Sequence, residues 1–115
     1  MAESRQLAVI MFTDIVGYTG IMQDNEAQAL IQMNRFRAEL NSNVEKFTGE
    51  VIQYYGDGSL VIFRNSVDAV NCAKTLQEIF NAEPKVPVRI GIHLGDIIKK
   101  DGNIFGNCVN ITSRI

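Results

Sequence analysis

An unbroken apolar run, Leu7 to Phe12, leads directly into Thr13 and Asp14, and Gly17 follows three residues later. A run that is apolar at every position indicates a central strand that is covered by the rest of the fold. A carboxylate at the end of such a strand is costly to bury unless it is paired or holds a metal. The pattern is typical of a place where a protein binds a cation and phosphate groups.

A second aspartate, Asp57, lies in the glycine-rich stretch Tyr55-Gly56-Asp57-Gly58. The two β-prone runs on either side, Glu50 to Tyr55 and Ser59 to Phe63, predict a hairpin. Each aspartate also has a simpler explanation, because Asp14 can cap a following helix and Gly-Asp-Gly is a common turn. The function therefore depends on whether the two aspartates meet.

Two stretches show the apolar spacing of amphipathic helices. The first runs from Asp24 to Phe47 and ends at Gly49, and the second begins at Asn65 or Ser66 and ends before two prolines. The apolar positions behind these predictions are Leu30, Met33, Leu40, Val44 and Phe47 in the first helix, and Val67, Val70, Ala73, Leu76 and Phe80 in the second.

The C-terminal third begins with an alternating strand, Val88 to Leu94, which has Arg89, Gly91 and His93 on one face. Asp101-Gly102 then predicts the turn of another hairpin, and residues 106–115 predict the start of a third helix. The whole order indicates an α+β, ferredoxin-like βαββαβ core with an appended β-hairpin and helix. Right-handed crossovers place the Asp57 hairpin at the end of the sheet where the first strand delivers Asp14.

Two facing carboxylates without a cation would repel one another. With one or two Mg²⁺ ions between them they become a template for a triphosphate, because Mg²⁺ leaves its remaining positions to phosphate oxygens and water. Two such ions can stabilise both oxygens of an in-line phosphoryl displacement. The segment Gly17-Tyr18-Thr19 offers backbone N–H groups at a turn into a helix, which suits phosphate.

The composition is that of an ordinary globular domain. The 115 residues are 46% hydrophobic and 21% charged, with a net charge of −2, so no electrostatic footprint for nucleic acid or an anionic membrane is present. Cys72 and Cys108 lie far apart without metal-ligand spacing, which favours free thiols in a reducing cytoplasm. We expect one domain over residues 1–115, incomplete at its C-terminal end, with no membrane segment.

Four motifs resemble the class III adenylate/guanylate cyclase catalytic domain, in order and approximate spacing over the whole chain. They are Phe12-Thr13-Asp14-Ile15-Val16-Gly17-Tyr18-Thr19, Tyr55-Gly56-Asp57-Gly58, Val88-Arg89-Ile90-Gly91-Ile92-His93-Leu94-Gly95 and Val109-Asn110-Ile111-Thr112-Ser113-Arg114. The resemblance implies an enzyme that forms a 3′,5′-cyclic nucleotide and pyrophosphate from a nucleoside triphosphate. It also implies a head-to-tail homodimer with Mg²⁺ or Mn²⁺, two per active site, at the interface.

The resemblance implies residue roles as well. Asp14 and Asp57 match the metal-binding aspartates, Ile15 would add a backbone carbonyl, and Arg89 matches a phosphate contact. Asn110 matches the residue that orients the ribose and Arg114 the one that stabilises the pentavalent phosphorus, both acting from the partner subunit. Because Asn110 and Arg114 are four residues apart, they would share one helix face, although Arg114 alone also fits a solvated surface charge.

The base-reading positions depart from the family pattern. Where adenylate cyclases of the family have lysine and aspartate, this chain has Gln53 and Asn103, amides that can donate or accept. ATP is the expected substrate, with GTP or a pyrimidine nucleotide as alternatives. A catalytically degenerate nucleotide-binding or dimerisation module is the competing hypothesis, and other phosphoryl chemistry, such as dinucleotide cyclisation, lacks its Gly-Gly-acidic signature here.

Overall fold

The computed structural model describes residues 4–100 and 103–105, with side chains over residues 7–97. The chain folds in the order β1 (Ser4–Ile15), α1 (Tyr18–Asp24), α2 (Glu26–Lys46), β2 (Glu50–Tyr55), β3 (Gly58–Phe63), α3 (Ser66–Asn81), β4 (Val88–Lys100) and β5 (Asn103–Phe105). In the described part of the chain, no helix has the length and apolar character needed to cross a membrane.

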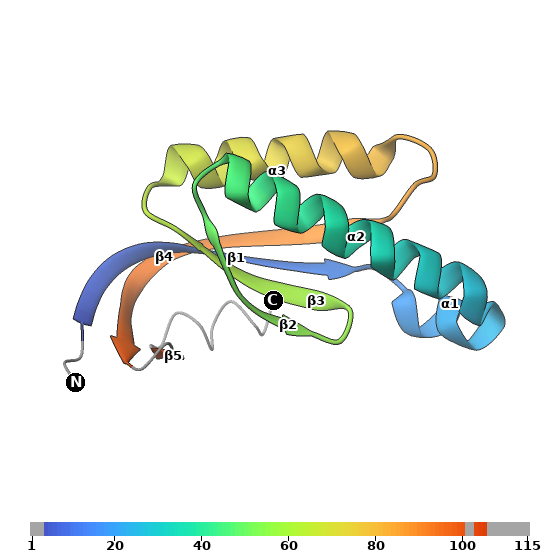
Figure 1. The fold of residues 1–115 in the computed structure, drawn as a ribbon, viewed down its shortest axis with the longest axis horizontal. Coiled ribbons are helices and arrows are strands. Elements are labelled where there is room, and N and C mark those ends of the chain that lie inside the picture. The colour runs from blue at the N-terminus through green and yellow to red at the C-terminus, as the bar shows by residue number, and fades with distance from the viewer. Residues whose placement is uncertain (1–3, 101–102, 106–115) are drawn as a thin grey trace.

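The strands form one antiparallel sheet in the order β2-β3-β1-β4-β5, with β1 between β3 and β4. Helices α2 and α3 lie side by side over one face of this sheet (Figure 1). The predicted ferredoxin-like core is confirmed, and so is the prediction that the first strand is central. The appended hairpin is present as β4 and β5, whereas the predicted third helix lies outside the described residues.

Each face of the sheet carries its own apolar cluster because side chains alternate along a strand. On the helix face, Val9 and Met11 of β1 belong to a large buried cluster that includes Phe36, Leu40, Val44, Val61, Phe63, Cys72, Leu76 and Phe80. The opposite face, called the open face below, has a smaller cluster of Ala8, Ile10, Leu60, Ile62 and Ile97, with Phe12 and Ile52 packed against it.

The helices differ in detail from the prediction. A short helix, α1, precedes the predicted one, and α2 begins at Glu26 after Asn25, whose side chain accepts a hydrogen bond from the Gln28 N–H group. The left-handed residue that follows α2 is Thr48 (φ 59°), one residue before the predicted terminator Gly49. Asn65 caps α3 by accepting from the Asp68 N–H group, as predicted.

The buried stripe of each helix was predicted only in part. In α2, Leu30 is exposed and Phe36 is buried; in α3, Val67 and Val70 are exposed. Leu76 and Phe80 are buried as predicted, and they fall on one line at helical spacing with the other two buried positions of α3, Ala69 and Cys72. The prediction was wrong there because the two valines are apolar but lie on another side of the helix, away from the sheet.

Candidate active site

The β2–β3 hairpin meets the end of β1, where the sequence predicted that the two aspartates come together. Asp14 is opposite Gly58 in the antiparallel pairing of β1 and β3. The backbone N–H of Ile15 donates a hydrogen bond to the backbone oxygen of Asp57, with N and O 2.9 Å apart. The end of β1 and the hairpin turn share one end of the sheet (Figure 1). Topology therefore brings Asp14 and Asp57, which are distant in the sequence, to the same end of the sheet. This end, with Asp14 and Asp57, is called the acidic edge below.

Gly58 permits this close approach. A Cβ atom built on Gly58 would lie 2.6 Å from the backbone oxygen of Thr13 and 3.3 Å from Cβ of Asp14. A side chain at this position would therefore push the hairpin away from the strand that carries Asp14. Packing therefore requires glycine at position 58, whereas the left-handed residue of the turn is Gly56 (φ 54°).

Arg89 is the direct cross-strand neighbour of Asp14, from β4 on the other side of β1. Its Nη2 donates to Oδ2 of Asp14 at 3.0 Å, an ion pair on the open face. The hydrogen bond to Asp14 and the charge of that carboxylate raise the pKa of Arg89, and the charge of Asp57 adds to this effect. The guanidinium therefore lies in the field of both aspartates.

A buried hydrogen bond fixes the register one residue before Asp14. The hydroxyl oxygens of Thr13 and Ser59 are 2.6 Å apart, and these residues are 2% and 0% exposed. They are direct partners in the β1–β3 pairing and point to the helix face. Because a register shift would reverse every side chain, this bond keeps Asp14 on the open face.

Helix α2 holds the hairpin from the other side through residues that the sequence did not single out for this role. Arg37 donates from Nη2 to the backbone oxygen of Gly56 at 3.1 Å, and its guanidinium lies 4.7 Å from the ring centroid of Tyr54. The Tyr54 hydroxyl donates to Oδ1 of Asn41 at 2.7 Å. Burial raises the pKa of Tyr54 despite the opposing effects of Arg37 and Asn41. No local signal reveals these contacts, because they depend on how α2 crosses the sheet.

The predicted phosphate-binding segment forms the turn from β1 into α1. Gly17 is the N-cap residue of α1 in a left-handed conformation (φ 71°) and has no side chain with which to cap the helix. Tyr18 packs its side chain against the helix-face cluster, whereas Thr19 is exposed. Gly17 can therefore offer a phosphate only its backbone N–H group, whereas the Thr19 side chain is accessible to solvent. Ile15, predicted to lend a carbonyl, has its side chain buried in the core.

The residues predicted to read the base and to orient the ribose are spread along the chain. Gln53 is exposed, and it is paired with Leu60, whose side chain packs on the open face. Asn103 begins β5 and pairs with Lys100, at the end of β4 remote from Arg89. The structure thus does not bring Asn103 to the edge where Asp14 and Asp57 meet within one chain. Asn110 and Arg114 lie outside the described residues.

The acidic edge has the donor set that suits a hard divalent cation. Oδ1 of Asp14 is buried and has no hydrogen-bond partner, while Oδ2 is paired with Arg89. Among the residues described here, no group of three or more His, Cys, Asp or Glu side chains gathers. A site of two carboxylates fits Mg²⁺, which is commonly held by one or two carboxylates together with substrate phosphates.

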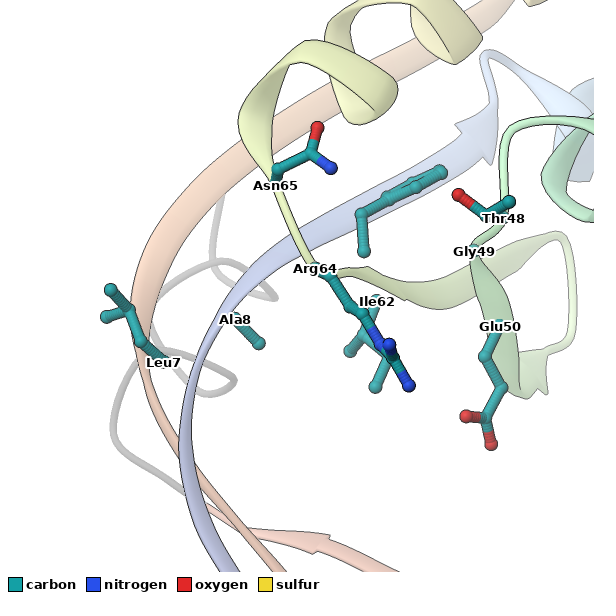
Figure 2. A pocket seen from close by; sticks show the side chains of 9 residues that line it. Leu7, Ala8, Thr48, Gly49, Glu50, Ile62, Arg64 and Asn65 are labelled. Carbon is teal, nitrogen blue, oxygen red and sulfur yellow. The ribbon is translucent and has the colours of Figure 1, made fainter.

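One cavity of the described structure lies away from the two aspartates. It has a volume of about 490 Å³ and lies near the start of β2 and the end of β3, between Leu7, Ile62, Glu50 and Arg64 (Figure 2). The length of β3, about 17 Å at the usual rise per residue, separates this cavity from the acidic edge. Glu50 is the single carboxylate in its lining, so this cavity lacks the paired aspartates of the candidate site.

The fold and its acidic edge define a ferredoxin-like α+β domain with two aspartates at the end of the central strand. The family model of the adenylate and guanylate cyclase catalytic domain matches residues 1–115, and the chain belongs to this family. The resemblance seen in the four motifs is thereby confirmed.

Two curated relatives and one solved structure illustrate the match. The chain is 36% identical to putative adenylate cyclase 3 of Rhizobium meliloti (strain 1021), over 96% of this chain and 20% of that protein. It is 25% identical to an adenylate cyclase of Anabaena cylindrica, over 99% and 28%. The crystal structure of an adenylate/guanylate cyclase/hydrolase from Silicibacter pomeroyi superimposes with a TM-score of 0.87 at 31% identity, covering 98% of this chain and 70% of that one. The chain therefore spans less than a third of either curated relative.

Proposed function

We propose that the protein is a nucleotide cyclase of intracellular signalling that converts a nucleoside triphosphate, with ATP favoured, to a 3′,5′-cyclic nucleotide and pyrophosphate. In this reaction the ribose 3′-oxygen attacks the α-phosphorus, and the bond from that phosphorus to the pyrophosphate oxygen breaks. The observation that carries the proposal is the meeting of Asp14 and the Asp57 hairpin at one sheet edge, where Oδ1 of Asp14 is buried without a partner. Family membership supports the same reaction class.

Asp14 and Asp57, with the backbone carbonyl of Ile15, would hold Mg²⁺ or Mn²⁺, two per active site. When bound, these ions supply Lewis-acid stabilisation of the attacking and leaving oxygens. Gly17, Tyr18 and Thr19 present backbone N–H groups to the phosphates. Arg89 contributes a charged, forked donor for a phosphate oxygen. Asp14 and Arg89 are direct cross-strand partners, and Gly17 begins the turn into α1 just after the same end of β1.

We infer that a second copy of the chain completes the site. Asn103 lies at the far end of β4 from Arg89, so one subunit that binds the triphosphate at Asp14 and Asp57 cannot reach the base with its own Asn103. In the proposed homodimer, the partner subunit contributes base-reading amides, together with Asn110 for the ribose and Arg114 for the charge that develops on phosphorus. A fixed guanidinium at a reacting phosphoryl group can supply several orders of magnitude in rate.

The base is the least determined part of the substrate. Amide groups at Gln53 and Asn103 can each present a donor or an acceptor, so they do not select adenine in the way that a lysine and an aspartate would. ATP is favoured because relatives of this chain are named adenylate cyclases. GTP and pyrimidine nucleotides are the alternatives. We place the enzyme in the cytoplasm, which suits the free buried thiol of Cys72.

The decisive experiment incubates the full-length protein separately with ATP, GTP, CTP and UTP in the presence of Mn²⁺ and identifies the product by mass spectrometry. A 3′,5′-cyclic nucleotide is expected, and it names the base at the same time. Asp14→Asn and Asp57→Asn should each abolish product formation while the protein stays folded. Asp24→Asn, which removes the same charge from an exposed position at the end of α1, is the matched control and should keep activity.

The competing function is a catalytically silent module that binds nucleotide or mediates dimerisation. The departures at Gln53 and Asn103 from the family pattern favour it. A full-length protein that binds a nucleoside triphosphate but forms no cyclic product with any of the four would decide for this alternative. Unchanged turnover in Asp14→Asn or Asp57→Asn would instead refute the two-metal site.

A further inference from the structure

The ion pair between Arg89 and Asp14 gives the acidic edge a positive charge that belongs to the chain itself. The two residues are directly opposite in the pairing of β1 and β4, so their side chains are neighbours on the open face. The side chain of Arg89 is 61% exposed and that of Asp14 is 36% exposed. Small ligands can therefore reach the pair, and the guanidinium is free to swing away from it.

Arg89 and a divalent cation would compete for the same carboxylate, that of Asp14. Arg89 engages Oδ2 of Asp14, and Oδ1 of the same carboxylate is the buried oxygen without a partner. A carboxylate that is already paired with a guanidinium attracts a cation less strongly. The guanidinium and a cation at the same carboxylate would also repel each other. The field of Asp57 also acts on Arg89, so the guanidinium offsets charge from both aspartates.

We propose that Arg89 is the resident counter-ion of Asp14 in the nucleotide-free protein and that it moves to the triphosphate when a divalent cation takes its place. This inference rests on the proposed metal site at Asp14. Arg89 then has two successive partners, a carboxylate before substrate binds and a phosphate afterwards, and it suits both because its forked donors match either group. Metal binds weakly to the free protein as a result, and the triphosphate favours it by giving the released guanidinium a new partner.

The test measures binding of Mn²⁺ alone to the full-length protein, without nucleotide, from the electron paramagnetic resonance signal of free Mn²⁺. Arg89→Ala is compared with Arg64→Ala. Arg64 carries the same charge and follows the last residue of β3 (Figure 2), about 20 Å along the sheet from Asp14. Arg89→Ala should bind Mn²⁺ about two- to fivefold more tightly than Arg64→Ala, the range expected for an exposed ion pair. Asp14→Asn added to Arg89→Ala should remove this gain.

Three results would overturn the inference: equal Mn²⁺ affinities in the two arginine variants, weaker binding by Arg89→Ala, or no Mn²⁺ binding by Arg89→Ala. Weaker binding in particular would mean that Arg89 orients Asp14 as a ligand and does not compete for it. Failure of the proposed function appears in a different measurement. A protein with the expected order of Mn²⁺ affinities that forms no cyclic nucleotide would refute the cyclase proposal and leave the counter-ion role standing.

Discussion

Replacing Gly58 by alanine tests whether the contact between the β2–β3 hairpin and β1 sets the geometry of the acidic edge. The added Cβ would lie 2.6 Å from the backbone oxygen of Thr13, and ordinary contacts begin at 3.4 Å, so these two atoms must move apart by 0.8 Å to reach an ordinary contact. The obstacle is backbone and cannot rotate aside. The displacement therefore acts on the hairpin that carries Asp57 and on the strand that carries Asp14.

A shift of this size has two measurable consequences. Overpacking of this kind costs about 1–3 kcal/mol of unfolding free energy. A misplacement near 1 Å in a catalytic constellation can cost about 10²-fold in rate. We therefore expect Gly58→Ala to remain folded and to lose about two orders of magnitude in kcat/KM for cyclic nucleotide formation.

The assay is the rate of cyclic product formation at saturating Mn²⁺, with denaturant unfolding of the same preparations to correct for the folded fraction. Gly20→Ala is the matched control, because a Cβ at that position in α1 meets nothing within 4 Å. It should keep both stability and activity. A Gly58→Ala variant that loses stability but retains wild-type kcat/KM would refute the idea that this contact positions the two aspartates.

Two further predictions concern stability. Thr13→Val should cost about 1–3 kcal/mol, because it leaves the buried Ser59 hydroxyl without a partner, and adding Ser59→Ala should cost less than the sum of the single changes; additive costs in denaturant unfolding would contradict this. Burial raises the pKa of Cys72 from 9.0 to about 11, so the thiol contributes stability that is fully present below pH 9 and lost as the pH rises towards 11. Cys72→Ala should reduce this part of the alkaline loss, measured as unfolding free energy against pH, and an unchanged slope would refute it.

The sequence was sufficient for the topology and for the meeting of the two aspartates. The hydrophobic periods of strands and helices predict the order of the elements. Right-handed crossovers then place the Asp57 hairpin at the end of the sheet where Asp14 lies. The alternation of Val88 to Leu94 likewise predicted that Arg89 shares a face with Gly91 and His93. These properties are local or topological, so they can be derived from residue spacing.

The tertiary structure alone decided which groups touch at that edge. The pairing of Arg89 with Asp14 depends on the register of β4 against β1, which differs by a whole face for a shift of one residue. The hydrogen bond from Arg37 to the backbone oxygen of Gly56 depends on how α2 crosses the sheet. The exposure of Val67 and Val70 depends on which side of α3 meets the sheet. Such contacts join residues that are distant in the chain, so the spacing of residues in the sequence does not predict them.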